Sequence, residues 1–319
     1  MAHTTMHRAA SGARPSAAQS DHIAEELHRY DEHLRDVRGL AAETRKGRIR
    51  VVGLLLQQKF SGRAIHIAKL RPDDIRQFLA TKLGANRSAS HASHLAATLR
   101  SYFRYRTTCG DQVGNLTAVI SNPVHWKLAS LPRALKREEA ERLLNSFTVG
   151  LRLPKRDYAI VRCALDMGLR SGEIAHLMIS DIDWRAGTVT LRGTKSLRQD
   201  ILPLPMETGR ALADYLQHER PTTSNPAIFV RQKEGHDHPI TSTAIQKVIK
   251  RACRRIGLTH SSAHTLRHTL ACRLVENGSP LKEVADVLRH RSLNTTLIYA
   301  KLDTPKLSVV PLPWPGSKS

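Results

Sequence analysis

The spacing of the apolar residues most constrains this fold, because it changes character along the 319-residue chain. From about Asp21 to Thr108, apolar residues recur every three or four positions, which is the period of an amphipathic helix. The clearest run consists of Ile65, Ile67, Leu70, Ile75, Phe78 and Leu79. A chain of this length exceeds what one hydrophobic core usually organises. We therefore expect two domains, of which the first is small and all-helical.

The second half of the chain mixes helices with two short strands. Gly187–Arg192 and Asp200–Leu204 are rich in apolar and β-branched residues and predict an antiparallel hairpin. The other predicted elements up to Lys301 are helices, among them Lys136–Phe147, a helix that opens at Ala263, Ser279–Leu288 and Leu293–Lys301. The predicted fold class is mainly α with a small antiparallel β-sheet, in which an all-helical N-terminal domain precedes an α+β domain.

Composition and turn residues place the domain boundaries. Residues 1–20 contain no acidic residue and are rich in Ala, Ser and Thr, which favours a disordered basic tail over an organelle transit peptide. A loop-like stretch from Cys109 to Leu131 contains two glycines and Asn122-Pro123, and four prolines after Asp303 prevent a helix from continuing. The predicted organisation is a tail at 1–20, a helical domain at 21–115, a linker at 116–135, a second domain at 136–303 and a C-terminal tail at 304–319.

The chain is strongly basic, since 50 Lys and Arg against 28 Asp and Glu leave a formal net charge of +22. This surplus favours a polyanionic partner, with nucleic acid first and an anionic membrane surface second. No apolar stretch approaches the roughly 18 residues of a membrane span. We therefore expect a DNA partner and a cytoplasmic, nucleoid-associated location, with no membrane. The cations expected to contact phosphates, unless they only solvate helix faces, are Arg45, Lys46, Arg48, Lys59, Arg63, Arg100 and Arg104.

One arginine of the second domain follows a predicted helix break. Gly168 is expected to stop one helix and Ser171 to cap the next, which places Arg170 in a turn beside a helix N-terminus. Backbone N–H groups at such a position favour an anion. Arg170 could instead only pair with Glu173, and Lys195 in the hairpin turn could serve only solubility.

A histidine and an arginine share the helix that opens at Ala263. His264 and Arg267 stand at positions i and i+3, so we expect both on one face, where a cation beside an imidazole suits a phosphate oxyanion. His264 and His268 also have the spacing of two zinc ligands. Thr265 stands where a zinc protease needs its glutamate, so a metalloprotease is disfavoured.

A further histidine and a tyrosine lie near the end of the second domain. His290 follows the helix Ser279–Leu288, and Tyr299 stands nine positions later on the helix predicted for Leu293–Lys301. A single tyrosine at a helix end is normally a packing residue. Taken alone, Tyr299 therefore indicates no function.

Taken together and in order, these segments resemble the motifs of the phage-integrase family of tyrosine recombinases. The segments are Gly168-Leu169-Arg170-Ser171-Gly172-Glu173, Lys195 followed by Leu202-Pro203-Leu204, His264-x-x-Arg267-His268-Thr269, Leu288-Arg289-His290, and Thr295-Thr296-Leu297-Ile298-Tyr299. Each motif is weak alone, but five in this order are specific. The resemblance spans about Leu131 to Lys301 and implies an integrase-type catalytic domain, whereas the helical half resembles the core-binding domain of the family only in type.

The resemblance implies a site-specific recombinase that breaks and rejoins duplex DNA through a 3′-phosphotyrosine at Tyr299 and a Holliday junction. It also implies a homotetramer on paired double-stranded recombination sites. Arg170 and Arg267 would bind the non-bridging phosphate oxygens, where their forks fit the developing charge. Lys195 would protonate the departing 5′ oxygen, although Arg198 lies in the same turn.

The remaining roles are also carried over from the resemblance. His264 would assist proton transfer at the tyrosine hydroxyl, His290 would hydrogen-bond the phosphate, and Glu173 would orient the site. The chain departs from the family pattern at Arg289, where glycine is usual, and at Arg291, where small residues are common. Arg289 adds bulk and charge near the scissile phosphate.

Two other functions fit parts of this pattern. A type IB topoisomerase would use the same chemistry to relax DNA without a partner site. A DNA-binding regulator that has kept the fold has no chemical need for Tyr299 or Lys195, so the complete set of residues argues against it.

The residue types at the predicted site generate the first testable prediction. Cationic side chains stand where a metal nuclease would cluster carboxylates, and the four cysteines form no CxxC pair, so we expect neither a metal nor another cofactor. A covalent intermediate would also retain the bond energy of the phosphodiester. DNA cleavage should therefore proceed in excess EDTA without ATP, and a strict requirement for magnesium in the cleavage step would contradict this expectation.

Overall fold

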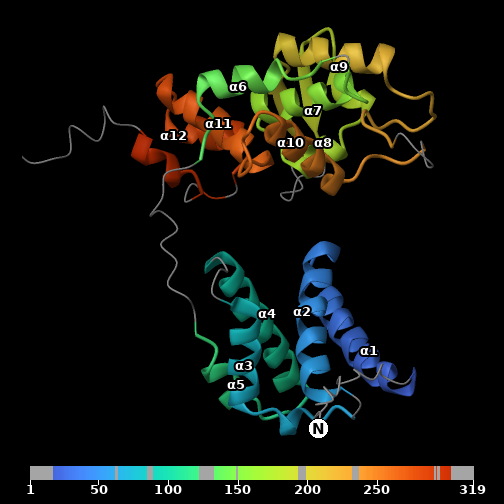
Figure 1. The fold of residues 1–319 in the computed structure, drawn as a ribbon, viewed down its shortest axis with the longest axis vertical. Helices are drawn as coiled ribbons and strands as arrows, with labels where there is room; N and C mark the ends of the chain where they lie inside the picture. Colours follow the sequence, from blue (N-terminus) through green and yellow to red (C-terminus); the bar gives the residue numbers. More distant parts are fainter. Residues whose placement is uncertain are drawn as a thin grey trace, which may run out of the picture. The chain divides into compact units, whose positions relative to one another are not determined.

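The computed structural model describes residues 17–61, 64–84, 89–121, 133–148, 150–192, 199–231, 237–290, 292 and 295–302. These residues form two compact units, one within Met1–Trp126 and one within Lys127–Ser319 (Figure 1). The predicted tail at 304–319 lies outside the described residues, as do Arg63, Lys195 and Arg198.

The first unit is all-helical. Its elements are α1 (Ala17–Glu32), a π-helical turn (His33–Val37), α2 (Ala42–Phe60), a 3-10 turn (Ile67–Lys69), α3 (Pro72–Leu83), α4 (Ala89–Thr108) and α5 (Gly114–Ala118). Helix α2 packs against α1, α3 and α4 (Figure 1). The helical spacing of the apolar residues places Leu56, Phe78, Leu99 and Tyr102 in one buried core.

The structure differs from the prediction at both ends of this unit. Helix α1 begins at Ala17, inside the stretch predicted to be a disordered tail, whereas residues 1–16 lie outside the described residues. The predicted loop after Cys109 contains helix α5, and Leu116 and Ile120 are buried in the first core. A five-residue helix is too short to leave a periodic pattern in the sequence, and burial of these two side chains stabilises it. The finer domain boundaries stay predictions.

The second unit surrounds a central helix. Its helices are α6 (Arg137–Leu144), α7 (Pro154–Asp166), α8 (Ser171–Ala175), a 3-10 turn (Ile179–Asp181), α9 (Met206–His218), α10 (Ser242–Arg255), α11 (Ala263–Glu276), α12 (Leu281–Val287) and the 3-10 helix η5 (Leu297–Leu302). Helix α7 contacts α6, α8, α9, α10 and α11. This helix carries apolar side chains on almost every side, which is typical of a helix surrounded by other elements. Its fully buried residues include Ile160, Val161, Cys163 and Leu165.

The sheet of the second unit has three antiparallel strands in the order β1 (Ile182–Asp183), β2 (Thr188–Leu191) and β3 (Asp200–Pro203). Val189 pairs with Leu202, and both side chains are buried in the main core. The predicted hairpin is therefore confirmed, as is the fold class. The two-residue strand β1 was not predicted, because so short a segment carries no alternation.

A smaller apolar cluster forms where α11, α12 and η5 meet. Cys272 and Val275 of α11, Val284 of α12 and Leu288 pack around Tyr299. Residues 297–302 form a 3-10 helix, where an α-helix had been predicted over Leu293–Lys301. The backbone N–H of Tyr299 donates to the carbonyl of Thr296, three residues back, which is the hydrogen bond of the tighter helix.

Gly168 marks a close approach between the end of α7 and the site segments. Its φ of +59° lies in the left-handed region that favours glycine. A Cβ built on Gly168 would lie 2.9 Å from Cδ2 of Leu270 and 3.0 Å from Cδ2 of Leu288. Gly187, with a φ of +64°, has the same backbone requirement but no heavy atom within 4 Å of such a Cβ.

These two glycines generate the second prediction. Gly187→Ala should lower the free energy of unfolding by about 1 kcal/mol, the cost of a side chain in left-handed backbone. Gly168→Ala should lower it by about 2–4 kcal/mol, because overpacking against two leucines adds to that cost. Urea denaturation of both variants measures the difference. Equal losses would show that the contacts of Gly168 tolerate a methyl group.

Candidate active site

Arg170 stands at the N-cap of helix α8. Its backbone N–H donates to Oε2 of Glu173 at 2.8 Å, and its Nη1 donates to Oε1 of the same carboxylate at 2.6 Å. The expected cap, Ser171, is instead the first residue of the helix. An acid in the first turn satisfies a free N–H group and complements the helix dipole. The Arg170 side chain is 40% exposed, so it can reach a ligand in solvent.

Arg267 ties α11 to two other segments of the chain. Its guanidinium donates through Nη1 to the carbonyl of Gly168 at 2.5 Å and through Nη2 to the carbonyl of Leu288. The residue is only 5% exposed. Burial and the nearby cations Arg170 and Arg289 lower the pKa of Arg267 to about 9, so the group stays charged at neutral pH. The site therefore contains a desolvated cation held by backbone carbonyls.

His264 and Arg267 differ in burial although they are three positions apart. His264 lies exposed in the first turn of α11, whereas Arg267 is buried. On the face that they were predicted to share, His264 therefore lies in solvent and Arg267 in the interior. His264 is close enough to His268 to lower the pKa of that imidazole, after the larger effect of burial.

The hydroxyl of Tyr299 contacts His268, a residue of the family motif to which the sequence assigned no catalytic role. Nδ1 of His268 forms a hydrogen bond with Oη of Tyr299, and the two ring centroids lie 5.6 Å apart. Tyr299 is 1% exposed, and burial raises its pKa. Burial and the charges of His264 and Arg267 lower the pKa of His268, which favours a neutral ring that can accept a proton.

His290 lies next to the arginines, after helix α12. Its Nδ1 is 2.8 Å from Oγ1 of Thr296, a fully buried hydroxyl. Burial, and then Arg267 and Arg170, lower the pKa of His290 to about 4. The imidazole is therefore neutral at neutral pH, with its orientation set by Thr296.

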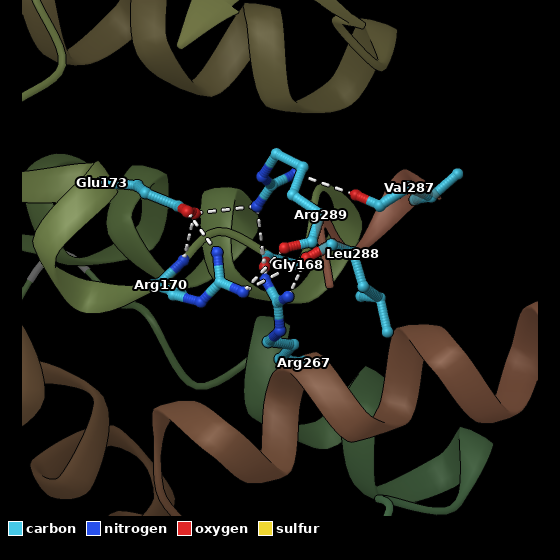
Figure 2. Close-up of polar contacts among 7 residues, drawn as sticks. All are labelled: Gly168, Arg170, Glu173, Arg267, Val287, Leu288 and Arg289. Atoms are coloured by element: carbon cyan, nitrogen blue, oxygen red, sulfur yellow. Dashed lines mark hydrogen bonds and ion pairs between the residues drawn. The ribbon is translucent and has the colours of Figure 1, made fainter. Parts of the chain in front are cut away.

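Arg289 provides a third guanidinium at this site (Figure 2). Its φ is 53°, and it is the one non-glycine position with positive φ among the described residues. Left-handed backbone costs an arginine roughly 1–2 kcal/mol, which explains why glycine suits this position. Nη2 of Arg289 lies 2.7 Å from Oε2 of Glu173, which is also bound by Arg170.

Glu173 is the carboxylate that Arg170 and Arg289 share. Burial opposes its ionisation, but Arg289, the backbone N–H of Arg170 and the Arg170 side chain together hold its pKa below the ordinary value. Figure 2 shows Arg170, Arg267 and Arg289 around Glu173 and the carbonyls of Gly168 and Leu288. The structure thus brings Arg170, Glu173 and Arg267 together as the sequence predicts.

The cations predicted to contact DNA in the first unit mostly have partners within it. Arg45 pairs with Asp31, Lys46 with Glu43 and Lys59 with Asp74. The remaining described members are Arg48, which donates to Ser101, Arg100, which donates to the carbonyl of Ile120, and Arg104, which is exposed. The aromatic residues between the arginines of α4 are core residues, since Tyr102, Phe103 and Tyr105 are buried. The DNA contacts stay predictions.

Two further features of the described part of the chain bear on function. Its histidines, cysteines and acids form no group of three or more that could hold a metal ion. Among its helices, none combines the length and apolar character that crossing a membrane requires.

Comparison with known proteins shows the family to which this chain belongs. Residues 133–305 match the family described as the phage integrase family. The chain is 34% identical over 296 residues to the integrase/recombinase-type protein y4rA of Sinorhizobium fredii, covering 92% of this chain and 72% of that protein. The chain belongs to the phage integrase family of tyrosine recombinases. It is therefore an enzyme that breaks and rejoins DNA, and the family resemblance of the sequence is confirmed.

Two further comparisons support the family and the fold. The tyrosine recombinase XerC of Oceanobacillus iheyensis is 31% identical over 241 residues, covering 73% of this chain and 77% of XerC. A crystal structure of a lambda integrase tetramer bound to a Holliday junction superposes with a TM-score of 0.65 at 17% identity, covering 86% of this chain and 76% of that one. At this identity the superposition shows a shared fold.

Two residues of the recombinase site were missed or undervalued from sequence. His268 directly follows Arg267, and this adjacency could have suggested a place at the site. No sequence signal identified its contact with Tyr299, because the two residues lie 31 positions apart and meet only through tertiary packing. Arg289 was noticed as a departure from glycine, but its pairing with Glu173 spans 116 positions of the sequence.

The lowered pKa of His290 generates the third prediction. An imidazole whose folded-state pKa is about 4, against an ordinary 6.5, binds its proton only in the unfolded chain between these values. Stability should therefore fall as the pH is lowered from about 6.5 to about 4. Melting temperatures measured over this range should fall less in His290→Gln than in the wild type. Parallel curves for the two proteins would contradict a depressed pKa at His290.

Proposed function

We propose that this enzyme is a site-specific recombinase in which Tyr299 is the nucleophile. The observation that carries the proposal is the meeting of Tyr299, His268 and two arginine forks, drawn from three segments, at one site. Arg267 also lies close enough to Tyr299 to oppose the rise in the pKa of its hydroxyl. A cation pair beside a tyrosine suits attack on a phosphodiester.

The proposed chemistry follows from these positions. Oη of Tyr299 attacks the phosphorus as its proton passes to an imidazole, and the bond from phosphorus to the 5′ oxygen breaks. Arg170 and Arg267 exchange backbone carbonyls for the non-bridging oxygens, whose charge grows in the transition state. Lys195 protonates the departing 5′ oxygen. A 5′-hydroxyl of another strand then reverses these steps, so that religation needs neither ATP nor a metal.

Two histidines can serve the tyrosine hydroxyl in this scheme. The hydrogen bond from Tyr299 and the lowered pKa of the partner ring support His268 as the proton acceptor. The role of His264, assigned from the family resemblance, stays a prediction. His290, oriented by Thr296, would hydrogen-bond the phosphate.

Tyr299 must leave its apolar surroundings to reach DNA. The side chain is 1% exposed within the cluster of α11, α12 and η5. A 3-10 helix has weaker hydrogen-bond geometry than an α-helix, so η5 is suited to move as a short unit. We propose that DNA binding shifts η5 so that the hydroxyl reaches the phosphate while it stays within hydrogen-bond reach of His268.

We further propose that the enzyme acts as a homotetramer on paired duplex sites through a Holliday junction. The lambda integrase tetramer bound to a Holliday junction, whose fold is similar, supports this proposal. The unit within Met1–Trp126 would be the core-binding domain and the unit within Lys127–Ser319 the catalytic domain. The cytoplasmic, nucleoid-associated location stays a prediction.

The fourth prediction tests the nucleophile. Tyr299→Phe should abolish covalent protein–DNA adducts while DNA affinity changes less than about twofold, because the variant loses one hydroxyl and retains the phosphate contacts. Nicked duplexes with randomised sequence are incubated with the enzyme, and adducts that survive denaturation are recovered and sequenced. This selection also identifies the cleavage site.

The matched control is Tyr158→Phe, which removes a partly buried tyrosine hydroxyl outside the proposed site. Adducts at wild-type yield in Tyr299→Phe would exclude Tyr299 as the nucleophile. Relaxation of supercoiled plasmid that lacks the selected site would favour a topoisomerase of type IB over a site-specific recombinase.

A further inference from the structure

Arg289 makes contacts that glycine, the usual residue at this position of the family, cannot make. Its guanidinium is almost fully buried, with the side chain 5% exposed. Nη1 donates to the carbonyl of Val287 at 2.8 Å, and Nη2 donates to the carbonyl of Gly168 at 3.4 Å. The shortest contact joins Nη2 to Oε2 of Glu173 at 2.7 Å (Figure 2). The side chain therefore links its own turn to the turn that carries Arg170.

Glu173 is bound by Arg289 and Arg170 at once. Its Oε1 accepts from Nη1 of Arg170, and its Oε2 accepts from both the Arg170 backbone and Arg289. A carboxylate that binds Arg170 also competes with a DNA phosphate for that guanidinium. Arg289 offsets this competition, because it supplies a second cation to the same carboxylate.

The charges of the cluster give the size of this effect. Arg170, Arg267 and Arg289 contribute three positive charges and Glu173 one negative charge, which leaves +2. Without Arg289 the cluster would carry +1, and Glu173 would pair with Arg170 alone. In a buried site this loss weakens the binding of any anion.

We propose that Arg289 is a positioning residue that shares the charge of Glu173, so that this carboxylate holds the Arg170 side chain only through Nη1 and leaves Nη2 to bind the scissile phosphate. Nη2 of Arg170 now donates to the carbonyl of Arg289 at 3.1 Å and to that of Leu288 at 3.5 Å. These are the contacts that phosphate oxygens would replace. The inference rests on the proposed function of Arg170 in phosphate binding.

Three variants separate charge from structure at this position. Arg289→Gly removes the cation and fits the left-handed backbone, so it should fold. Arg289→Lys keeps the charge without the planar fork. The double variant Arg289→Gly, Glu173→Gln removes both charges and restores the net +2 of the wild type. Arg210→Ala, which removes an exposed cation on α9, is the control for overall charge.

The first measurement is the affinity of the site for inorganic phosphate, followed by NMR through the imidazole signals of His290. Arg289→Gly should bind phosphate about tenfold more weakly than the wild type, because one nearby charge is lost. Arg289→Lys and the double variant should stay within about threefold of the wild type. Arg210→Ala should match the wild type.

The second measurement is the single-turnover rate of adduct formation on the DNA selected with the wild-type enzyme. At saturating DNA, Arg289→Gly should lower this rate about tenfold while its affinity for uncleaved DNA changes less than twofold, since many other phosphate contacts supply binding. Glu173→Gln in the same chain should restore most of the rate. A merely structural role would give losses that accumulate in the double variant.

Wild-type phosphate affinity in Arg289→Gly would overturn the inference, as would a double variant weaker than either single variant. Thermal unfolding of each variant confirms that the compared chains are folded. If the wild type formed no DNA adduct, the proposed function would fail, and the phosphate titration would still decide the role of Arg289.

Discussion

The rest of the site depends on the hydrogen bonds that the buried guanidinium of Arg267 makes to two backbone carbonyls. Its two hydrogen bonds join helix α11 to the carbonyl of Gly168, which follows α7, and to that of Leu288, which ends α12. A desolvated cation is costly unless its donors are satisfied, so these contacts hold the three segments in one arrangement. Gly168 permits this approach, because a side chain there would collide with Leu270 and Leu288.

This arrangement accounts for the electrostatics of the site. The arginines hold the pKa of Glu173 low against the effect of its burial, and burial together with Arg267 and Arg170 lowers the pKa of His290. The His290 imidazole, with a pKa of about 4, is thus neutral beside permanent cations. Such a site can bind an anion and can still accept a proton from the Tyr299 hydroxyl. In the proposed mechanism the arginines bind the phosphate and an imidazole accepts the proton.

Tyr299, the proposed nucleophile, is placed differently from the cations. Tyr299 is enclosed by an apolar cluster and bonded to His268, while Arg170 is partly open to solvent. In the proposed reaction η5 moves, whereas the arginines only exchange their hydrogen-bond acceptors. The recombinase family supplies the reaction class, and Arg289 adds a left-handed turn and a third guanidinium to the site of this chain.

The sequence by itself determined the fold class, the hairpin and the family, because helical periodicity, strand alternation and ordered motifs are local signals. It also predicted Arg170, Glu173 and Arg267 as site residues; the structure brings these side chains together, and their roles stay predictions. Only the tertiary structure decided that His268 contacts Tyr299 and that Arg289 pairs with Glu173. These pairs are 31 and 116 positions apart, and their meeting depends on how α11, α12 and η5 pack. Packing of this kind is set by side-chain shape and burial across the whole core, which no local pattern records.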